Sequence, residues 1–149
     1  MKTKISIAKE SDLIDLVLLL NDLFNQDEEF EPNEQLQKSG LLDILKNKNI
    51  GEILVLKVEN EIIGMVSLLY SISTVLGGKV AILEDMIIKQ KYRKSGYGTI
   101  LFKEAMEYAK NVGCLRITLL TDRGNEVAQK FYESFGFKKS PMLPMRLVF

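Results

Sequence analysis

Residues 93–98, RKSGYG, bring two cations, a hydroxyl and two glycines together directly before a helical pattern. The first N–H groups of a helix have no partners inside it and lie at its positive dipole end, so they attract phosphate groups. Glycine leaves those N–H groups uncovered, and the neighbouring cations add attraction for an anion. The spacing therefore predicts a diphosphate cradle formed by Arg93, Lys94, Ser95, Gly96, Tyr97, Gly98 and Thr99.

Other glycine motifs fit this segment poorly. A dinucleotide fingerprint needs a third glycine where this chain has Leu101, and the P-loop pattern of Gly-Lys-Ser/Thr is absent from the sequence. A plain turn between a strand and a helix remains an alternative. Lys89 and Lys91 are either solvated loop charges or further contacts to the ligand.

Two adjacent carboxylates, Glu84 and Asp85, interrupt the apolar run of residues 81–88. A carboxylate without partners is costly to bury, which favours a function for this pair. Adjacent side chains of a regular strand point to opposite faces, so we expect at most one of them to face a cleft. The alternative is a carboxylate tied to a backbone group or to a basic partner.

Composition excludes several kinds of site. The chain has 149 residues with 20 Lys plus Arg, 20 Asp plus Glu, no histidine and one cysteine, Cys114. We therefore expect no metal, no Ser-His or Cys-His nucleophile pair and no internal disulfide. Net charge gives no reason to expect a nucleic-acid partner, and the longest apolar run is far below the roughly 20 residues that span a bilayer. We expect a cytoplasmic protein without a membrane partner.

Periodic patterns place these residues in one layered domain, residues 1–149, of the α/β or α+β class. Strands are expected at residues 4–8, in a hairpin over 51–73 that turns at 59–61, and at 80–88, 115–121 and 142–149. Helices are expected after residues 11–12, over 34–47 with Gly40 as a weak point, after residue 98, and over 125–136. The strand–helix–strand crossover over residues 80–121 predicts a parallel pair of strands.

The chain resembles the GNAT superfamily of acetyl-CoA-dependent N-acetyltransferases. Residues 93–98 match the family's Arg/Gln-x-x-Gly-x-Gly/Ala signature, and residues 125–137 match its Asn-x-x-Ala-x-x-x-Tyr-x-x-x-Gly-Phe ending. The resemblance implies a mixed, twisted sheet of about six or seven strands, with helices on its faces and with the fourth and fifth strands splayed apart. It also implies that the loop holds the coenzyme A pyrophosphate, that the backbone of Ile87 and Ile88 pairs with pantetheine, and that Asn125 contacts the coenzyme.

The same resemblance implies direct attack of an amine on the thioester, without a covalent enzyme intermediate. Such a reaction needs a base, oxyanion donors and a weak acid near sulfur. Tyr132 occupies the family's usual acid position, and a phenol with a pKa of about 10 suits that role. Its alternative is an aromatic ring packed on the helix. Glu84 is the expected base or amine-binding group.

The acceptor is expected to be a small cationic amine such as a polyamine. In this family the segment between the first two helices borders the acceptor site, and here it carries Glu28, Glu29 and Glu31, which we assign with Asp85 to substrate binding. A solvated acidic loop is the alternative. Other functions left open are an acetyltransferase for amino-sugar phosphates or protein amines, and a coenzyme-A-binding regulatory module without catalysis. A homodimer is also left open.

Overall fold

The computed structural model describes residues 2–26 and 30–149. Its strands are β1 (Thr3–Ile7), β2 (Gly51–Val58), β3 (Glu61–Ser73), β4 (Gly78–Ile88) and β5 (Ile117–Leu119). Its α-helices are α1 (Leu13–Asn25), α2 (Glu34–Leu45), α3 (Tyr97–Asn111) and α4 (Glu126–Ser134), with short 3-10 helices η1 (Glu10–Asp12) and η2 (Gln90–Tyr92). These elements confirm the predicted mixed α/β class.

The chain divides into two compact units, residues 1–119 and 120–149, and the structure does not fix the position of one relative to the other. The first unit contains the sheet with α1, α2 and α3, and the second contains α4. One domain over residues 1–149 stays a prediction.

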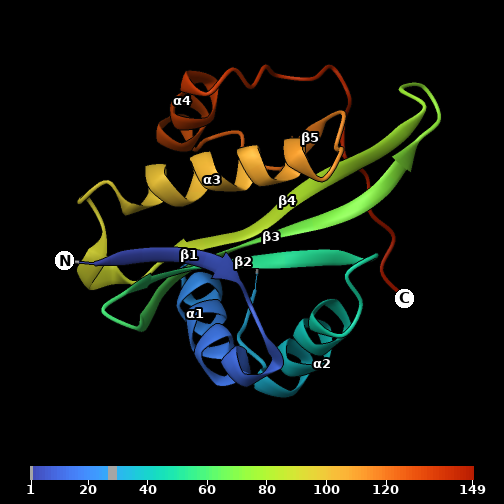
Figure 1. The fold of residues 1–149 in the computed structure, drawn as a ribbon. Helices are drawn as coiled ribbons and strands as arrows, with labels where there is room; N and C mark the ends of the chain where they lie inside the picture. Colours follow the sequence, from blue (N-terminus) through green and yellow to red (C-terminus); the bar gives the residue numbers. More distant parts are fainter. Residues whose placement is uncertain (1, 27–29) are drawn as a thin grey trace. The chain divides into compact units, whose positions relative to one another are not determined.

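The first unit is a three-layer structure built on a sheet whose strand order is β1-β2-β3-β4-β5. Neighbouring strands are antiparallel except β4 and β5, which are parallel and are joined by α3. Figure 1 shows α1 and α2 on one face of this sheet and α3 on the other. The predicted crossover and its parallel pair are therefore confirmed.

Two expectations about the strands were wrong. The described residues form five strands rather than six or seven, and residues 142–149 are not in a strand. Pro144 explains the second error, because it removes an N–H donor from a segment that would have to pair along its length, and Pro141 directly precedes that segment. Apolar side chains there are exposed, including Met145 at 89%. The composition of this segment suggested a strand, but its backbone is poorly suited to one.

Each face of the sheet has its own core. α1 places Leu16, Leu19 and Leu20 on one stripe, at the spacing of a helix that packs by one face. These side chains pack with Val55 of β2 and Met65 of β3 in the core between the sheet and α1 and α2. On the other face α3 buries its own stripe, which consists of Leu101, Phe102, Ala105 and Ala109.

A buried carboxylate ties α3 to the sheet. Glu52 of β2 is 9% exposed, and its two oxygens accept hydrogen bonds from Tyr70 Oη at 2.9 Å and from Tyr108 Oη at 2.5 Å. Burial and the bond to Glu52 raise the pKa of Tyr108 to about 12 and that of Tyr70 further. Both phenols therefore stay protonated donors at neutral pH. Lys79 Nζ lies 4.1 Å from the centre of the Tyr70 ring and adds a cation–π contact.

Tyr108→Phe should lower the free energy of unfolding by about 1–3 kcal/mol, because the buried carboxylate of Glu52 loses one of its two phenol donors. Urea unfolding measures this loss. Tyr92→Phe is the matched control: its hydroxyl also donates to a carboxylate, Glu61, but that side chain is 37% exposed and water can replace the donor. Equal losses for the two variants would contradict a special role for the buried carboxylate.

Candidate functional site

The loop before α3 contains two residues with left-handed backbone conformation. Lys94 has a φ of 61°, and Gly96, the N-cap of α3, has a φ of 88°. Glycine adopts this conformation at little cost, whereas lysine does so rarely, and such strain gathers at functional sites. Left-handed residues in a loop of this kind turn N–H groups toward a common concavity that suits an anion.

Gly98, in the first turn of α3, is glycine for a different reason. Its φ is not positive, and an added Cβ would lie 3.9 Å from Ile88 Cγ1 and 4.0 Å from Met86 Cε, which are ordinary contact distances. Neither the backbone nor the available space therefore demands glycine. Among the described residues, no side chain caps this helix start by a hydrogen bond, and its first turn carries no acid. The absent side chain leaves the first N–H groups of α3 uncovered, which fits a phosphate ligand.

Arg93 is partly engaged inside the protein. Its Nε donates to the carbonyl of Ile88 at 2.7 Å and so ties the cradle loop to the end of β4. The side chain also lines a polar cavity of about 240 Å³ together with Asp22, Asn25, Gln26 and Gln90. Of the two cations predicted for the cradle, Lys94 is exposed and Arg93 is half-buried and bonded to the strand.

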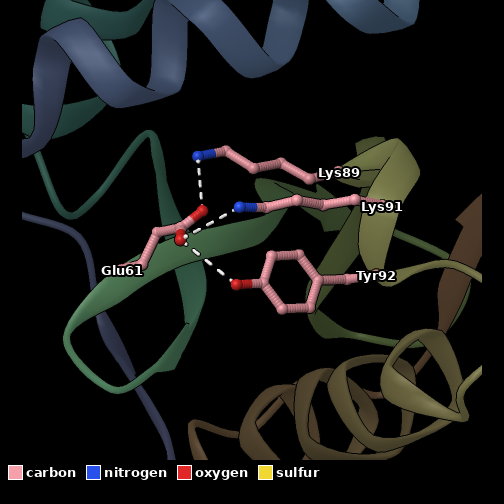
Figure 2. A network of polar contacts seen from close by, with 4 residues as sticks. All are labelled: Glu61, Lys89, Lys91 and Tyr92. Carbon is pink, nitrogen blue, oxygen red and sulfur yellow. Dashed lines mark hydrogen bonds and ion pairs between the residues drawn. The ribbon is translucent and has the colours of Figure 1, made fainter.

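Lys89 and Lys91 belong to a structural network (Figure 2). Lys89 Nζ lies 3.0 Å from Glu61 Oε2, and Lys91 Nζ lies 3.6 Å from Glu61 Oε1. Tyr92 Oη donates to Glu61 Oε1 at 3.1 Å, and the Tyr92 ring packs edge-on to that of Tyr97, with centres 6.0 Å apart. These contacts hold η2 and the start of α3 against β3. They favour the view that both lysines are structural charges rather than ligand contacts.

One edge of β4 lacks a strand partner beyond Leu83. β5 pairs with β4 only over residues 81–83, so in the first unit's described residues the stretch 84–88 has strand pairing on its β3 side alone. The N–H of Lys89 donates to β3 at Ile63, and alternation along the strand then turns the N–H and C=O of Ile88 toward the open edge. Those of Ile87 point toward β3. Ile88 is thus the better placed of the two residues predicted to pair with an extended ligand.

β4 contains a bulge at the two carboxylates. Ser67 of β3 pairs with Glu84, but Met65, two residues earlier, pairs with Ile87, so β4 has one residue more than β3 over this stretch. Asp85 has a φ of 52°, in the left-handed region that asparagine and aspartate tolerate better than most residues. Bulges redirect side chains and are frequent beside active sites.

The bulge places Glu84 and Asp85 on the same face of the sheet, so the predicted opposite orientation was wrong. Cross-strand partners share a face, and Glu84 lies in one row with Ser67 and with Ile53, a core residue on the α1 and α2 side. Asp85 lines a cavity on that same side. The alternation on which the expectation rested holds only for a regular strand, and the extra residue breaks it.

Asp85 lines a largely apolar cavity of about 270 Å³. The other lining residues come from the facing sides of α1 and α2: Leu20, Phe24, Leu36, Gln37, Gly40, Leu41 and Ile44. Burial first, and then the charge of Glu84, raise the pKa of Asp85 to about 6. Glu84 itself is exposed and does not line this cavity. A half-buried carboxylate that titrates near neutral pH can bind an ammonium group or accept a proton.

The apolar lining was not predicted from the sequence, although Gly40 gave one usable signal. A glycine inside a helix costs stability and often has a packing or functional reason. Here a Cβ at Gly40 would meet nothing within 4 Å, which is consistent with its position on the cavity wall. Of the predicted acidic loop, Glu31 is exposed, and Glu28 and Glu29 lie outside the described residues.

The second unit carries the remaining predicted residues. The side chain of Asn125 caps α4 by accepting from the N–H of Ala128 at 3.1 Å. Tyr132 is half-buried, and burial raises the pKa of its phenol. Its ring centre lies 5.6 Å from that of Phe131 and 6.2 Å from that of Phe137. The phenol is therefore held among aromatic rings and stays protonated at neutral pH.

In the part of the chain that the structure describes, no group of three or more His, Cys, Asp or Glu side chains is arranged to hold a metal ion. Within the same residues, no helix has the length and apolar character needed to cross a membrane.

Comparison with known proteins agrees with this geometry. The chain is 30% identical over 119 residues to the uncharacterized N-acetyltransferase YhfO of Bacillus subtilis (strain 168), covering 78% of this chain and 80% of YhfO. It is 26% identical over 137 residues to the glucosamine 6-phosphate N-acetyltransferase of Trypanosoma brucei brucei, covering 91% and 88% of the two chains. The crystal structure of a transcriptional regulator from Bacillus halodurans C-125 superposes with a TM-score of 0.81 at 29% identity, covering 99% and 100%.

The model of the acetyltransferase (GNAT) family matches residues 16–137, a span that includes both sequence motifs, the bulged β4 and the start of α3. The resemblance inferred from those motifs is therefore confirmed. This protein belongs to the acetyltransferase (GNAT) family and is an acyltransferase.

Proposed function

We propose that the protein transfers the acetyl group of acetyl-CoA to a small cationic primary amine by direct attack. One observation carries the proposal: residues 85 and 86 of β4 reach both sides of the sheet. Asp85 lines the cavity on the α1 and α2 side, while the terminal methyl of Met86 lies near the position that a Cβ on Gly98 would occupy. Adjacent residues of β4 thus lie beside the proposed diphosphate cradle on one side of the sheet and beside the proposed acceptor cavity on the other.

The residues of the cradle fit coenzyme A. Its pyrophosphate would lie at the uncovered first turn of α3, with Lys94 and Ser95 exposed beside it. Its pantetheine arm would extend along the open edge of β4, where the N–H of Ile88 can pair with an amide oxygen. Ile87 and Asn125 remain proposed contacts from the family resemblance.

The chemistry requires three proton transfers, because the amine loses two protons and the leaving sulfur gains one. The nitrogen of the neutral amine bonds to the thioester carbon, the carbon–sulfur bond breaks, and the sulfur leaves as a thiolate that takes up a proton. The amine loses one proton before attack and another as the amide forms. We assign the carboxylate role to the pair Glu84 and Asp85. The cavity favours Asp85 as the group that binds the amine and accepts its proton, and Glu84, the base predicted from the sequence, is the alternative.

An amino-sugar phosphate is a second candidate acceptor, since one relative is a glucosamine 6-phosphate N-acetyltransferase. The cavity argues against it. Among the described residues that line the cavity, Asp85 is the single charged side chain, and its carboxylate would repel a phosphate. A cationic acceptor therefore fits the described residues better than an anionic one.

The proposal predicts release of free coenzyme A thiol when the protein meets acetyl-CoA and a primary amine, with the acetylated amine identified by mass. Gly98→Glu should weaken acetyl-CoA binding by well over tenfold, because its carboxylate would stand at the first turn of α3. Isothermal calorimetry measures the affinity. Thermal unfolding should change little, since a Cβ at this position meets only ordinary contacts.

Asn111→Glu is the matched control, because it adds the same charge at the other end of α3. It should leave acetyl-CoA affinity unchanged. Unchanged affinity in Gly98→Glu would remove the cradle assignment. A protein that binds acetyl-CoA yet releases no thiol with any amine would instead be the regulatory module considered from the sequence.

A further inference from the structure

Among the described residues that line the cavity, Asp85 is the one polar side chain available to a ligand. The other polar side chain of this described lining, Gln37, is 7% exposed and already bonded within the protein. Gln37 Nε2 donates to the Val17 carbonyl at 3.3 Å and to Asn21 Oδ1 at 2.8 Å, and its Oε1 accepts from the Asn33 N–H at 2.7 Å. Both of its N–H groups and its oxygen are thus engaged. From the side chains that the structure describes, a ligand in this cavity would meet one available carboxylate and otherwise mainly hydrocarbon.

The apolar character continues to the mouth of the cavity. Leu36, on the cavity wall, is 70% exposed. Phe30 is 47% exposed, and its ring centre lies 6.0 Å from that of Phe24, another wall residue. Exposed apolar side chains that border a concave apolar surface are typical of ligand-binding sites.

We infer that the preferred acceptor is a small primary monoamine with an apolar alkyl or aryl body, whose ammonium group pairs with Asp85 and whose body lies between α1 and α2. This inference rests on the proposed function and names the substrate class of the same site. A volume of about 270 Å³ is just below the roughly 300–1,000 Å³ of sites for drug-sized ligands, so the acceptor is small.

The same surroundings discriminate against more polar amines. A polyamine would carry a second ammonium into the apolar part of the cavity, where the structure describes no second carboxylate on the wall. An amino sugar would bury hydroxyl groups opposite leucine and phenylalanine side chains. The acidic loop can still attract any cation from solution, but the cavity selects among the cations that arrive.

A homologous series of straight-chain amines tests the inference. From propylamine to hexylamine, kcat/KM should rise about fourfold for each methylene until the cavity is full. Butylamine should exceed 1,4-diaminobutane and glucosamine 6-phosphate by at least about tenfold, because both competitors must desolvate polar groups without partners. Thiol release with saturating acetyl-CoA provides the measurement.

Substitutions at two positions of the cavity wall, Gly40 and Leu36, test the inference. Gly40→Leu should fill the cavity and weaken the dependence of kcat/KM on amine chain length, while acetyl-CoA affinity stays unchanged. Gly40→Ala should weaken that dependence to a smaller extent. Leu36→Glu should improve use of the diamine relative to butylamine. Ile14→Glu is the matched control for Leu36→Glu, because Ile14 is 71% exposed and Leu36 is 70% exposed, but Ile14 does not line the cavity. The control should leave the ratio of diamine to butylamine turnover unchanged.

The outcomes separate the inference from the proposed function. Absence of thiol release with every amine would overturn the proposed function. Release that is independent of chain length, or that favours diamines, sugar phosphates or peptide N-termini over alkylamines, would overturn the inference alone. Thermal unfolding of each variant confirms folding, and the graded pair at Gly40 keeps the test decisive if the larger substitution fails to fold.

Discussion

Asp85→Asn should lower turnover by about 10²–10⁴-fold, the usual contribution of a general acid or base. Asparagine keeps the shape of the side chain and tolerates the left-handed backbone at this position, where φ is 52°. It cannot take up a proton or pair its charge with an ammonium group. Steady-state rates with an amine give the loss, and unchanged calorimetric affinity for acetyl-CoA shows that the donor site is intact.

The same substitution should stabilise the protein at neutral pH. Burial and the charge of Glu84 raise the pKa of Asp85 from an ordinary 3.8 to about 6, so the folded state holds a proton that the unfolded state has released over this interval. Stability therefore falls as pH rises from about 4 to about 6, and the penalty is fully present above that range. Asp85→Asn removes a penalty of about 1–3 kcal/mol.

Urea unfolding at two pH values tests whether Asp85→Asn stabilises the protein at neutral pH. The variant should be more stable than the unmodified protein at pH about 8 and nearly equal to it at pH about 3, where most of the Asp85 carboxyl is protonated in both the folded and the unfolded state. Lower turnover together with higher stability is the pattern expected of a residue kept for function. A variant that loses stability equally at both pH values would indicate a structural role instead.

Glu84→Gln is the companion variant, because it removes the neighbouring charge while keeping Asp85. The pKa of Asp85 should then fall, so the acidic limb of the pH profile of kcat/KM should move to lower pH. If Glu84→Gln abolishes turnover and Asp85→Asn does not, the base predicted from the sequence is the right one and the assignment from the cavity is wrong.

The loop and helix start of the proposed cradle could be located from the sequence because their signals are local. A left-handed glycine, an uncovered first helical turn and nearby cations all lie within residues 93–99, and the structure places them at the start of α3. The sequence could not distinguish the cations that are available to a ligand from those that are paired within the protein. Glu61, which neutralises Lys89 and Lys91, comes from the β2–β3 hairpin, and a partner so distant in the chain leaves no local pattern.

The orientation of Glu84 and Asp85 could not be predicted, because β4 departs from a regular strand at these residues. Period-two alternation placed Glu84 and Asp85 on opposite faces, and one extra residue in β4 placed them on the same face. A bulge in an apolar run leaves little trace in composition, because any residue can occupy the extra position. The cavity then forms from residues of three elements, α1, α2 and β4, whose proximity only the fold establishes.

Tyr132→Phe should lower turnover by about 10²–10⁴-fold with little change in acetyl-CoA affinity. As the proposed acid, the phenol would act when the thiolate leaves, so its loss should raise the barrier of the chemical step and leave ground-state binding alone. Burial raises the pKa of Tyr132, which keeps the proton on the phenol at neutral pH until a strong base such as a thiolate appears.

The alternative for Tyr132 is packing, and its ring contacts allow a direct test. Phenylalanine keeps the ring beside Phe131 and Phe137, so a packing residue would lose neither stability nor turnover in Tyr132→Phe. Adding Phe131→Tyr to this variant returns a phenol one residue away on α4, roughly 100° around the helix. A positioned acid should not be rescued by that hydroxyl. Single-turnover measurements keep chemistry rate-limiting, and full turnover of Tyr132→Phe under those conditions would assign the residue to packing.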